Sequence, residues 1–181
     1  MKYKLTDVKI NFMGKTLFQI EAVKCFGDIV KGQKGGFIEK ESNLSQGGNA
    51  WVSGNAKVSG NAKVYGNAWV SGNAWVYGDA KVSGNAWVYG DAEVYGDAEV
   101  YGDAEVKGNA DYLVIGPIGS RNDITTFFKT ANNDIKVSCG CFTGTIEEFL
   151  EKVNETHGNN NYAKEYKTAV EIAKIHIFGG E

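Results

Sequence analysis

The middle of the chain alternates small and branched apolar residues with polar ones in a six-residue repeat. From Gly48 to Ala110 the unit Gly-[Asn/Asp]-Ala-x-Val-x recurs without a gap. Within a unit, Ala and Val fall two residues apart, as on the buried face of a short strand. Glycine with Asn or Asp then favours a corner, because these residues tolerate positive φ best. Each unit is therefore predicted to be one strand and one corner.

Strands this short bury their valines only by coiling and stacking, so the repeat predicts a solenoid with valine on valine along its axis. An aliphatic residue is followed four positions later by a small one, as in Val52 and Ala56. In this the repeat resembles the left-handed parallel β-helix (hexapeptide-repeat) family. The resemblance implies a triangular prism with three units per coil, and a left-handed crossover that the usual rule for parallel connections would not predict.

With three units per coil, the outward-facing positions sort into columns on three faces. One column contains Trp51, Trp69 and Trp87 and ends at an acidic residue. The other two columns mix charges, and consist of Lys57, Trp75 and Glu93 on one face and Lys63, Lys81 and Glu99 on the other. One interpretation is that the aromatic residues merely favour strands and cover their neighbours.

The other interpretation of the aromatic columns is an oligomer interface. Each aromatic side chain can bury roughly 150–250 Å², and soluble monomers seldom expose large apolar patches. The family resemblance also implies a homotrimer with parallel axes. We therefore expect a homotrimer with the Trp51, Trp69 and Trp87 face at or near the contact.

The segments on either side of the repeat are expected to close the solenoid, since its ends are open sheet edges. Residues 1–47 are predicted to form a β-hairpin cap (strands 4–12 and 16–23, with a turn near Gly14) and a degenerate first coil. Phe37, Ile38 and Leu44 would plug the first end of the core. The β-helix then spans 48–111, and a C-terminal α/β domain spans 112–181.

The C-terminal domain is predicted to have the order ββαα, within a chain that is mainly β. Residues 112–115 form a strand that leads into a glycine-bounded loop, and a hairpin follows with strands 124–130 and 135–141. Thr145 with Glu148 forms a capping box that starts a helix to about residue 156. Asn160 or Asn161 caps a second helix over 162–177.

Arg121, the only arginine, suggests a small-molecule site in the first loop of this domain. It follows Gly119 and Ser120, and such loops present backbone N–H groups while a guanidinium binds phosphate or carboxylate bidentately. The alternative is that Arg121 pairs with Asp123 and the loop only connects two strands.

A second group of anion-binding donors is expected where the first helix begins. Thr143 and Thr145 flank a glycine at this helix N-terminus, which favours negative charge. If the hairpin brings the two loops together, they frame a pocket for a small anion, with His157 and Tyr166 as its walls.

Other classes of function are disfavoured by the composition. The net charge is −3, from 19 basic and 22 acidic residues, which does not suit nucleic-acid binding. No apolar run is long enough for a membrane helix, and three cysteines make no disulfide framework, so a cytoplasmic location is expected. The last coils are acidic, which is typical of a solvated face, although carboxylates in register also suit calcium.

No metal or cofactor is expected in the C-terminal domain. Cys139-Gly-Cys141 is half of a zinc site, but Cys25, His157 and His176 are the only other sulfur or imidazole ligands, and tetrahedral zinc needs four ligands. The two cysteines are therefore expected to be buried thiols that pack as small apolar groups.

Enzymatic activity is also disfavoured. Hexapeptide-repeat acyltransferases are similar to this solenoid and carry a catalytic histidine near a loop extruded between coils. Residues 48–111 contain neither such a loop nor a histidine, and a γ-type carbonic anhydrase would need three histidine ligands where the chain has 2. We therefore expect a protein without catalytic residues.

The whole chain resembles proteins of phages and prophages of gut bacteria, over residues 34–39 and 43–45, the repeat, and 115–121, 139–142 and 156–158. Phages encode small oligomeric proteins that sequester nucleotide signals of bacterial immunity. The resemblance implies a homotrimer in the host cytoplasm that sequesters a cyclic nucleotide or another phosphate-bearing molecule. The alternative is a structural or adaptor solenoid that mediates oligomerisation without a ligand.

Overall fold

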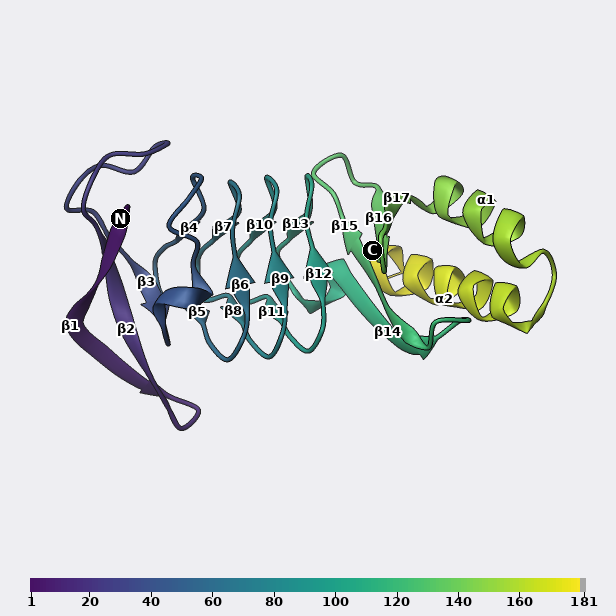
Figure 1. Cartoon of the computed structure of the whole chain (residues 1–181), viewed down its shortest axis with the longest axis horizontal. Helices are drawn as coiled ribbons and strands as arrows, with labels where there is room; N and C mark the ends of the chain where they lie inside the picture. Colours follow the sequence, from purple (N-terminus) through teal and green to yellow (C-terminus); the bar gives the residue numbers. More distant parts are fainter. Residues whose placement is uncertain (180–181) are drawn as a thin grey trace.

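A computed structural model describes residues 1–179 of the chain. Three parts follow one another along its long axis: an N-terminal group of strands, a stack of coils, and a sheet covered by two helices (Figure 1). The β-solenoid that the repeat predicted is confirmed, and so are two helices after a sheet at the C-terminal end.

The coils are built from two-residue strands, each formed by the x-Val pair of one unit. Each strand pairs in parallel with a strand three units away, so that Trp69 pairs with Trp87 and Val70 with Val88. The strands are β4 (Trp51–Val52), β5 (Lys57–Val58), β6 (Lys63–Val64), β7 (Trp69–Val70), β8 (Trp75–Val76), β9 (Lys81–Val82), β10 (Trp87–Val88), β11 (Glu93–Val94), β12 (Glu99–Val100) and β13 (Glu105–Val106).

Between its two ends, the interior of the coils is filled by the alanines and valines of the repeat. Every repeat alanine from Ala50 to Ala104 and every repeat valine from Val52 to Val106 is buried. Fully burying a valine side chain stabilises a fold by about 1.5–3 kcal/mol, and stacked copies of the same two side chains leave no mismatch between layers. Because the same pair recurs in each unit, every coil presents the same core to the next.

The corners depend on glycine and on polar ladders. The corner glycines from Gly48 to Gly102 have φ between 61° and 72°. The following Asn or Asp side chains bond from coil to coil, as where Asn55 Nδ2 donates to Asn73 Oδ1 (3.3 Å) and Asn73 Nδ2 donates to Asp91 Oδ1 (3.0 Å). Each ladder satisfies side-chain donors and acceptors that a corner would otherwise leave to water.

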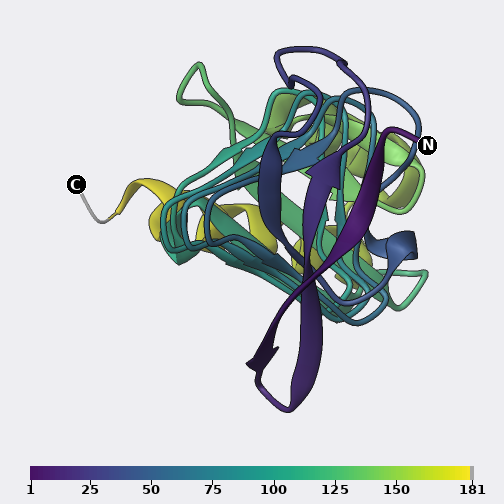
Figure 2. The ribbon, with the colours of Figure 1, turned by 90° about the vertical axis from the view of Figure 1, so that its left-hand side faces the viewer.

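The N-terminal strands extend one face of the solenoid. β1 (Tyr3–Phe12) and β2 (Lys15–Ala22) form an antiparallel hairpin, β2 pairs with β3 (Lys34–Ile38), and β3 joins β5 in parallel, which gives the sheet order β1-β2-β3-β5-β8-β11. In the end-on view of Figure 2 the coils superpose, and the turn of this hairpin projects beyond their outline.

The segment that leads into the first coil covers its core. Ile38 and Leu44 are buried beneath Val58 and Val64. Phe37 does not plug the core as expected, because it is half-buried in register with the outward-facing Lys57. A short 3-10 helix, η1 (Glu41–Asn43), lies between Ile38 and Leu44 in the chain.

Lys2 lies at this same end of the solenoid and is almost fully buried. Its Nζ donates to the carbonyl oxygens of Gly47, Gly48 and Ala50, the last at 2.7 Å. Burial, and then the charge of Lys24, lower the pKa of Lys2 to about 8. Backbone acceptors of the first coil are thus satisfied by a side chain from the start of the chain.

The C-terminal part has four strands before its helices, so the order ββαα was wrong. The antiparallel sheet β14-β15-β16-β17 comprises β14 (Tyr112–Ile118), β15 (Asp123–Lys129), β16 (Ile135–Cys139) and β17 (Phe142–Thr145). A two-residue turn at Gly140, with φ 62°, ends β16 early. The chain then returns as β17, whose Phe142 pairs with Cys139.

Two helices cover one face of this sheet, and the end of the solenoid covers the other. α1 (Ile146–His157) and α2 (Asn161–Phe178) share a buried cluster with Phe127 and Val137. The neighbouring Phe128 belongs to the core cluster of the coils. Thr130 bridges Ala104 in antiparallel fashion, and η2 (Asn109–Asp111) connects the last coil to β14. The sheet therefore closes the C-terminal end of the stack (Figure 1).

Candidate functional site

Arg121 lies exposed in the turn between β14 and β15, next to Ser120, which is also exposed. Its Nη2 is 4.0 Å from Asp123 Oδ2. The guanidinium also lies against the turn at Gly140, where a Cβ would come within 2.6 Å of Nη1. The arginine is thus held over the β16–β17 turn, beside a carboxylate of its own loop.

Gly119 has no free donor for an anion, because its N–H donates to Glu165 Oε2 (2.7 Å). The residue has φ 70°, and a Cβ here would overlap the Tyr166 hydroxyl. The glycine is therefore explained by a turn packed tightly beneath a tyrosine, and a carboxylate of α2 already occupies the place that a ligand oxygen would take.

Thr145 is not brought to the Arg121 loop, whereas Thr143 directly follows Phe142 and pairs with Ser138, so strand β17 holds the two threonines at different distances from that loop. On β17, Thr145 pairs with Lys136, while Phe142 pairs with Cys139 at the Arg121 end. Three residues of strand separate the two ends, which is about 10 Å. The predicted turn is a strand, and this strand carries Thr145 away.

The helix N-terminus is also occupied by the chain itself. Thr145 Oγ1 accepts from the Glu148 N–H (3.2 Å), and the Thr145 N–H donates to Glu148 Oε2 (2.8 Å). This is the predicted capping box. A carboxylate that already sits on the first turn leaves little for an added anion to gain there.

His157 and Tyr166 lie together on the Arg121 side of the domain, with ring centroids 5.9 Å apart. Tyr166 is buried, its hydroxyl lies 4.0 Å from Cys139 Sγ, and burial followed by Cys139 raises its pKa to about 12. Cys139 is half-buried, whereas Cys141 is exposed rather than buried as expected. Residues 1–179 contain no group of His, Cys, Asp and Glu that could hold a metal ion.

The tryptophan column has the predicted register but three different environments. Trp51 is fully buried against Tyr3 and Phe26, so its own side chain offers no surface to a second copy. Trp69 is half-buried, and its Nε1 donates to Ser53 Oγ in the preceding coil (2.9 Å). Trp87 is 58% exposed. The N-terminal segment, which sequence patterns did not place on this face, is what covers Trp51.

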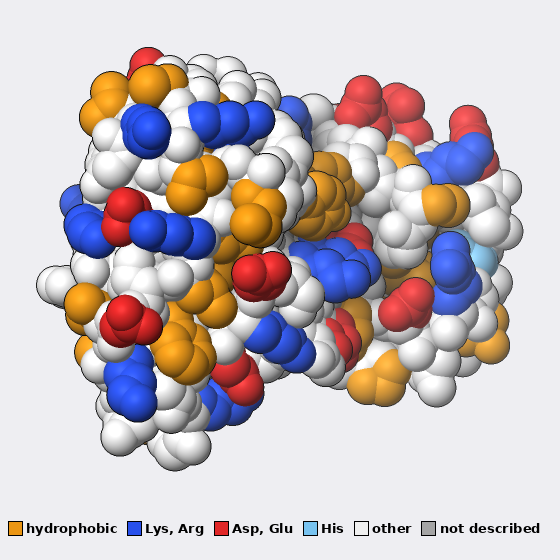
Figure 3. Space-filling view, turned by 60° about the vertical axis from the view of Figure 1, so that its left-hand side comes forward, with side chains coloured by type: hydrophobic (Ala, Val, Ile, Leu, Met, Phe, Trp, Pro, Cys, Tyr) orange, Lys and Arg blue, Asp and Glu red, His pale blue; other side chains and the backbone are white. Residues whose placement is uncertain are grey.

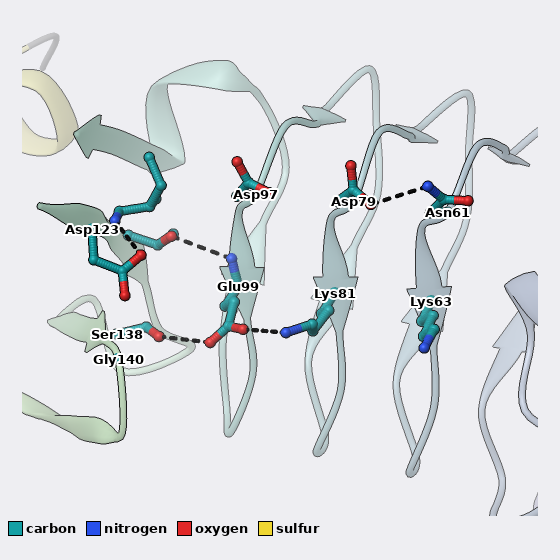
Figure 4. Close-up of a pocket in the computed structure, with 11 residues that line it drawn as sticks. Asn61, Lys63, Asp79, Lys81, Asp97, Glu99, Asp123, Ser138 and Gly140 are labelled. Carbon is teal, nitrogen blue, oxygen red and sulfur yellow. Dashed lines mark hydrogen bonds and ion pairs between the residues drawn. The ribbon is translucent and has the colours of Figure 1, made fainter. Parts of the chain in front are cut away.

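A groove of about 630 Å³ runs from one face of the coils onto the C-terminal sheet (Figure 4). Its lining residues come from three successive coils and from the sheet that closes them: Asn61, Lys63, Asp79, Lys81, Asp97, Glu99, Asp123, Ile124, Thr126, Ser138 and Gly140. The column Lys63, Lys81 and Glu99 was visible in the sequence. The wall at the sheet was not, because it depends on how the C-terminal part packs on the last coil.

Glu99 connects the coil face that forms the floor of the groove to the C-terminal sheet that closes its end. It accepts from Lys81 Nζ (2.6 Å) and from Ser138 Oγ (3.3 Å), and its N–H donates to Thr126 Oγ1 (3.2 Å). The hydrogen bond from Lys81 to Glu99 also raises the lysine's pKa. These contacts join both charges to their neighbours, so this part of the groove is polar and hydrogen-bonded.

Charges of both signs are mixed over the surface. In the view of Figure 3, Lys and Arg side chains lie between Asp, Glu and apolar side chains, without a large patch of one sign. Over residues 1–179, neither helix combines the length and the apolar character that crossing a membrane requires.

Comparison with known proteins bears on the coils. A search of curated proteins found no match. A family model described as the YdcK beta solenoid repeat matches residues 56–72 and 62–78, which contain strands β5 to β8. In this stretch the chain is similar to YdcK-type β-solenoid repeats.

Proposed function

We propose that the protein is a non-enzymatic structural solenoid that assembles as a homotrimer through the face bearing Trp69 and Trp87. The rigid, uninterrupted coils and the match to a β-solenoid repeat support a scaffold role. Following the resemblance to the β-helix family, we also propose that the coils wind left-handed and that the hairpin β1–β2 caps the stack. The bacterial cytoplasm is the proposed location.

The observation that carries the assembly is the position of Trp87. The indoles of Trp69 and Trp75 each fold onto a serine 16 residues earlier, with Nε1–Oγ distances of 2.9 and 3.2 Å. Trp87 has Ser71 at the same offset, yet its side chain is 58% exposed. An exposed indole on a flat, repetitive face is a typical anchor for a protein partner.

Sedimentation equilibrium at micromolar concentration tests the homotrimer. Lysine occupies this position in other units, so Trp87→Lys should fold and sediment as a monomer. Tyr95→Ser is the matched control, because Tyr95 is an exposed aromatic (49%) on another face, and this variant should remain trimeric. A wild-type protein that sediments as a monomer, or a trimeric Trp87→Lys variant, contradicts the proposal.

A second candidate function is sequestration of a small phosphate-bearing molecule, such as a cyclic nucleotide that signals in bacterial immunity. It is favoured by the exposed guanidinium of Arg121, which lies against Gly140 at the edge of the groove, and by the resemblance to phage proteins. Arginine forks bind phosphate well.

Thermal melting with a panel of cyclic dinucleotides and cyclic ADP-ribose isomers tests this candidate. A ligand that binds only the folded protein must raise the melting temperature. Arg121→Ala should abolish the rise, while Arg121→Lys should retain part of it because the charge remains. If no ligand of the panel changes the melting temperature, the scaffold role stands without sequestration.

A further inference from the structure

One side of the groove is formed by the stacked corner residues Asn61, Asp79 and Asp97. This corner ladder differs from the ladders at the other two corners of the coil. At this corner Lys40 Nζ donates to Asn61 Oδ1 (3.2 Å), and Asn61 Nδ2 donates to Asp79 Oδ1 (3.1 Å). The next residue up the ladder is Asp97. A carboxylate has no proton to donate, so the run of hydrogen bonds stops between Asp79 and Asp97.

The other two corners contain no such pair of stacked carboxylates. At one of these corners the ladder continues from Asn73, whose Nδ2 donates to Asp91 Oδ1 (3.0 Å). In the other, Asn67 donates to Asn85 (3.1 Å), and Asp103 one coil further on is neutralised by Lys136 Nζ (2.6 Å). The break in the ladder between two exposed carboxylates, one coil layer or about 4.8 Å apart, is therefore particular to the groove.

Positive charge lies beside these carboxylates, in the neighbouring column of the groove that contains Lys63 and Lys81. Lys81 is held by Glu99 and also feels the charge of Asp97. Lys63 lies one layer further from the sheet, and within residues 1–179 its Nζ makes no hydrogen bond or ion pair, while its backbone N–H donates to Ala80 in the coil ladder. The unpaired ammonium group of Lys63 thus lies one to two layers along the axis, about 5–10 Å, and two residues along the strand, about 6–7 Å, from the gap between Asp79 and Asp97.

We propose that this groove binds a small zwitterion, whose ammonium group lies between Asp79 and Asp97 and whose anionic group binds Lys63. The groove's volume of about 630 Å³ is in the range of small-molecule sites, and such sites favour junctions between parts of a fold. Lysines on the floor disfavour a polycation, and the stacked carboxylates disfavour a polyanion. The proposed contacts at Asp79, Asp97 and Lys63 use neither the trimer face nor Arg121, which lies at the sheet end of the groove.

Isothermal titration of the full chain with ε-aminocaproate tests the inference. Spermidine and inorganic phosphate serve as probes that carry only one of the two charges, and each should bind more weakly than the zwitterion. Glycine should also bind more weakly, because its charged groups are too close together to span a coil layer.

Two variants locate the binding. Asp97→Asn replaces one of the two stacked carboxylates with an amide that can donate to Asp79, so it should fold normally by circular dichroism but bind ε-aminocaproate roughly tenfold more weakly or worse, since a charged partner is lost. Lys63→Gln should weaken binding comparably. The matched control is Asp91→Asn, at the same ladder position of a corner outside the groove, which should bind like the wild type.

The inference is overturned if ε-aminocaproate does not bind the wild type at millimolar concentration. It is also overturned if spermidine or phosphate binds as tightly as the zwitterion, or if Asp97→Asn binds unchanged. Sedimentation of the same samples reports the trimer separately, and Arg121→Ala should leave ε-aminocaproate binding intact, so these results distinguish the groove from the proposed function.

Discussion

Every corner glycine of the coils from Gly48 to Gly102 has a left-handed backbone conformation, which strains any residue with a Cβ. At most inner corners the backbone of the next coil also lies close enough to crowd an added Cβ. Within the stack a Cβ on Gly84 would lie 2.6 Å from the Gly102 nitrogen, whereas a Cβ on Gly102 would meet nothing within 4 Å.

This difference predicts unequal costs for two identical substitutions. Gly102→Ala should lower the free energy of unfolding by about 1–2 kcal/mol, from backbone strain alone. Gly84→Ala should cost at least about 1 kcal/mol more, because backbone of the next coil must also move. Urea unfolding followed by circular dichroism measures both, and equal losses would show that stacking does not constrain the inner corners.

Single-residue environments were the least predictable feature of this chain. Trp51 and Trp87 occur in equivalent units, and no local pattern distinguishes them. Their burial, complete for one and slight for the other, depends on a segment from residues 2–26 that packs on the first coil only. The same holds for the groove, whose end wall comes from a sheet far away in sequence.

At the level of elements, prediction succeeded where local chemistry alone decides. The repeat has one possible period, and the capping residues Thr145 and Asn160 lie where the helices begin. It failed at β17, because Phe142–Thr145 is a short segment without clear alternation that becomes a strand only through pairing with β16. That one missed strand is also why the two-loop pocket was expected.

The contribution of the N-terminal cap of α1 to stability can be tested by substitution. Thr145→Ala removes the oxygen that accepts from the Glu148 N–H and should lower the free energy of unfolding by about 1 kcal/mol. Thr143→Ala is the control, since this exposed residue lies two positions earlier on the same strand and should change stability little. Chemical denaturation of both variants measures the difference; a comparable loss for Thr143→Ala would assign the effect to β17 instead.

At the scale of the whole molecule, we expect that one complete coil can be deleted without disturbing the stacking of the others. Deletion of residues 67–84, one 18-residue turn of the ladder, joins Gly66 to Asn85 and keeps every column in register. The shortened protein should melt cooperatively, and its longest dimension in small-angle X-ray scattering should fall by about 4.8 Å.

Deletion of residues 73–75 provides the comparison. It removes fewer residues but takes one alanine out of the core and leaves a coil that cannot close, so it should lose more stability than the longer deletion. If the longer deletion instead melts at the lower temperature, the coils do not behave as interchangeable layers.

The antiparallel sheet laid across the last coil has a consequence for self-assembly beyond the chain. A stack of parallel strands in register, with like side chains above like, is also the arrangement of an amyloid fibril, and a bare final layer would be a template for the next molecule. Thr130 and the neighbouring strand β15 occupy that layer in the wrong direction for continued parallel addition. Growth of filaments is thereby terminated within each molecule.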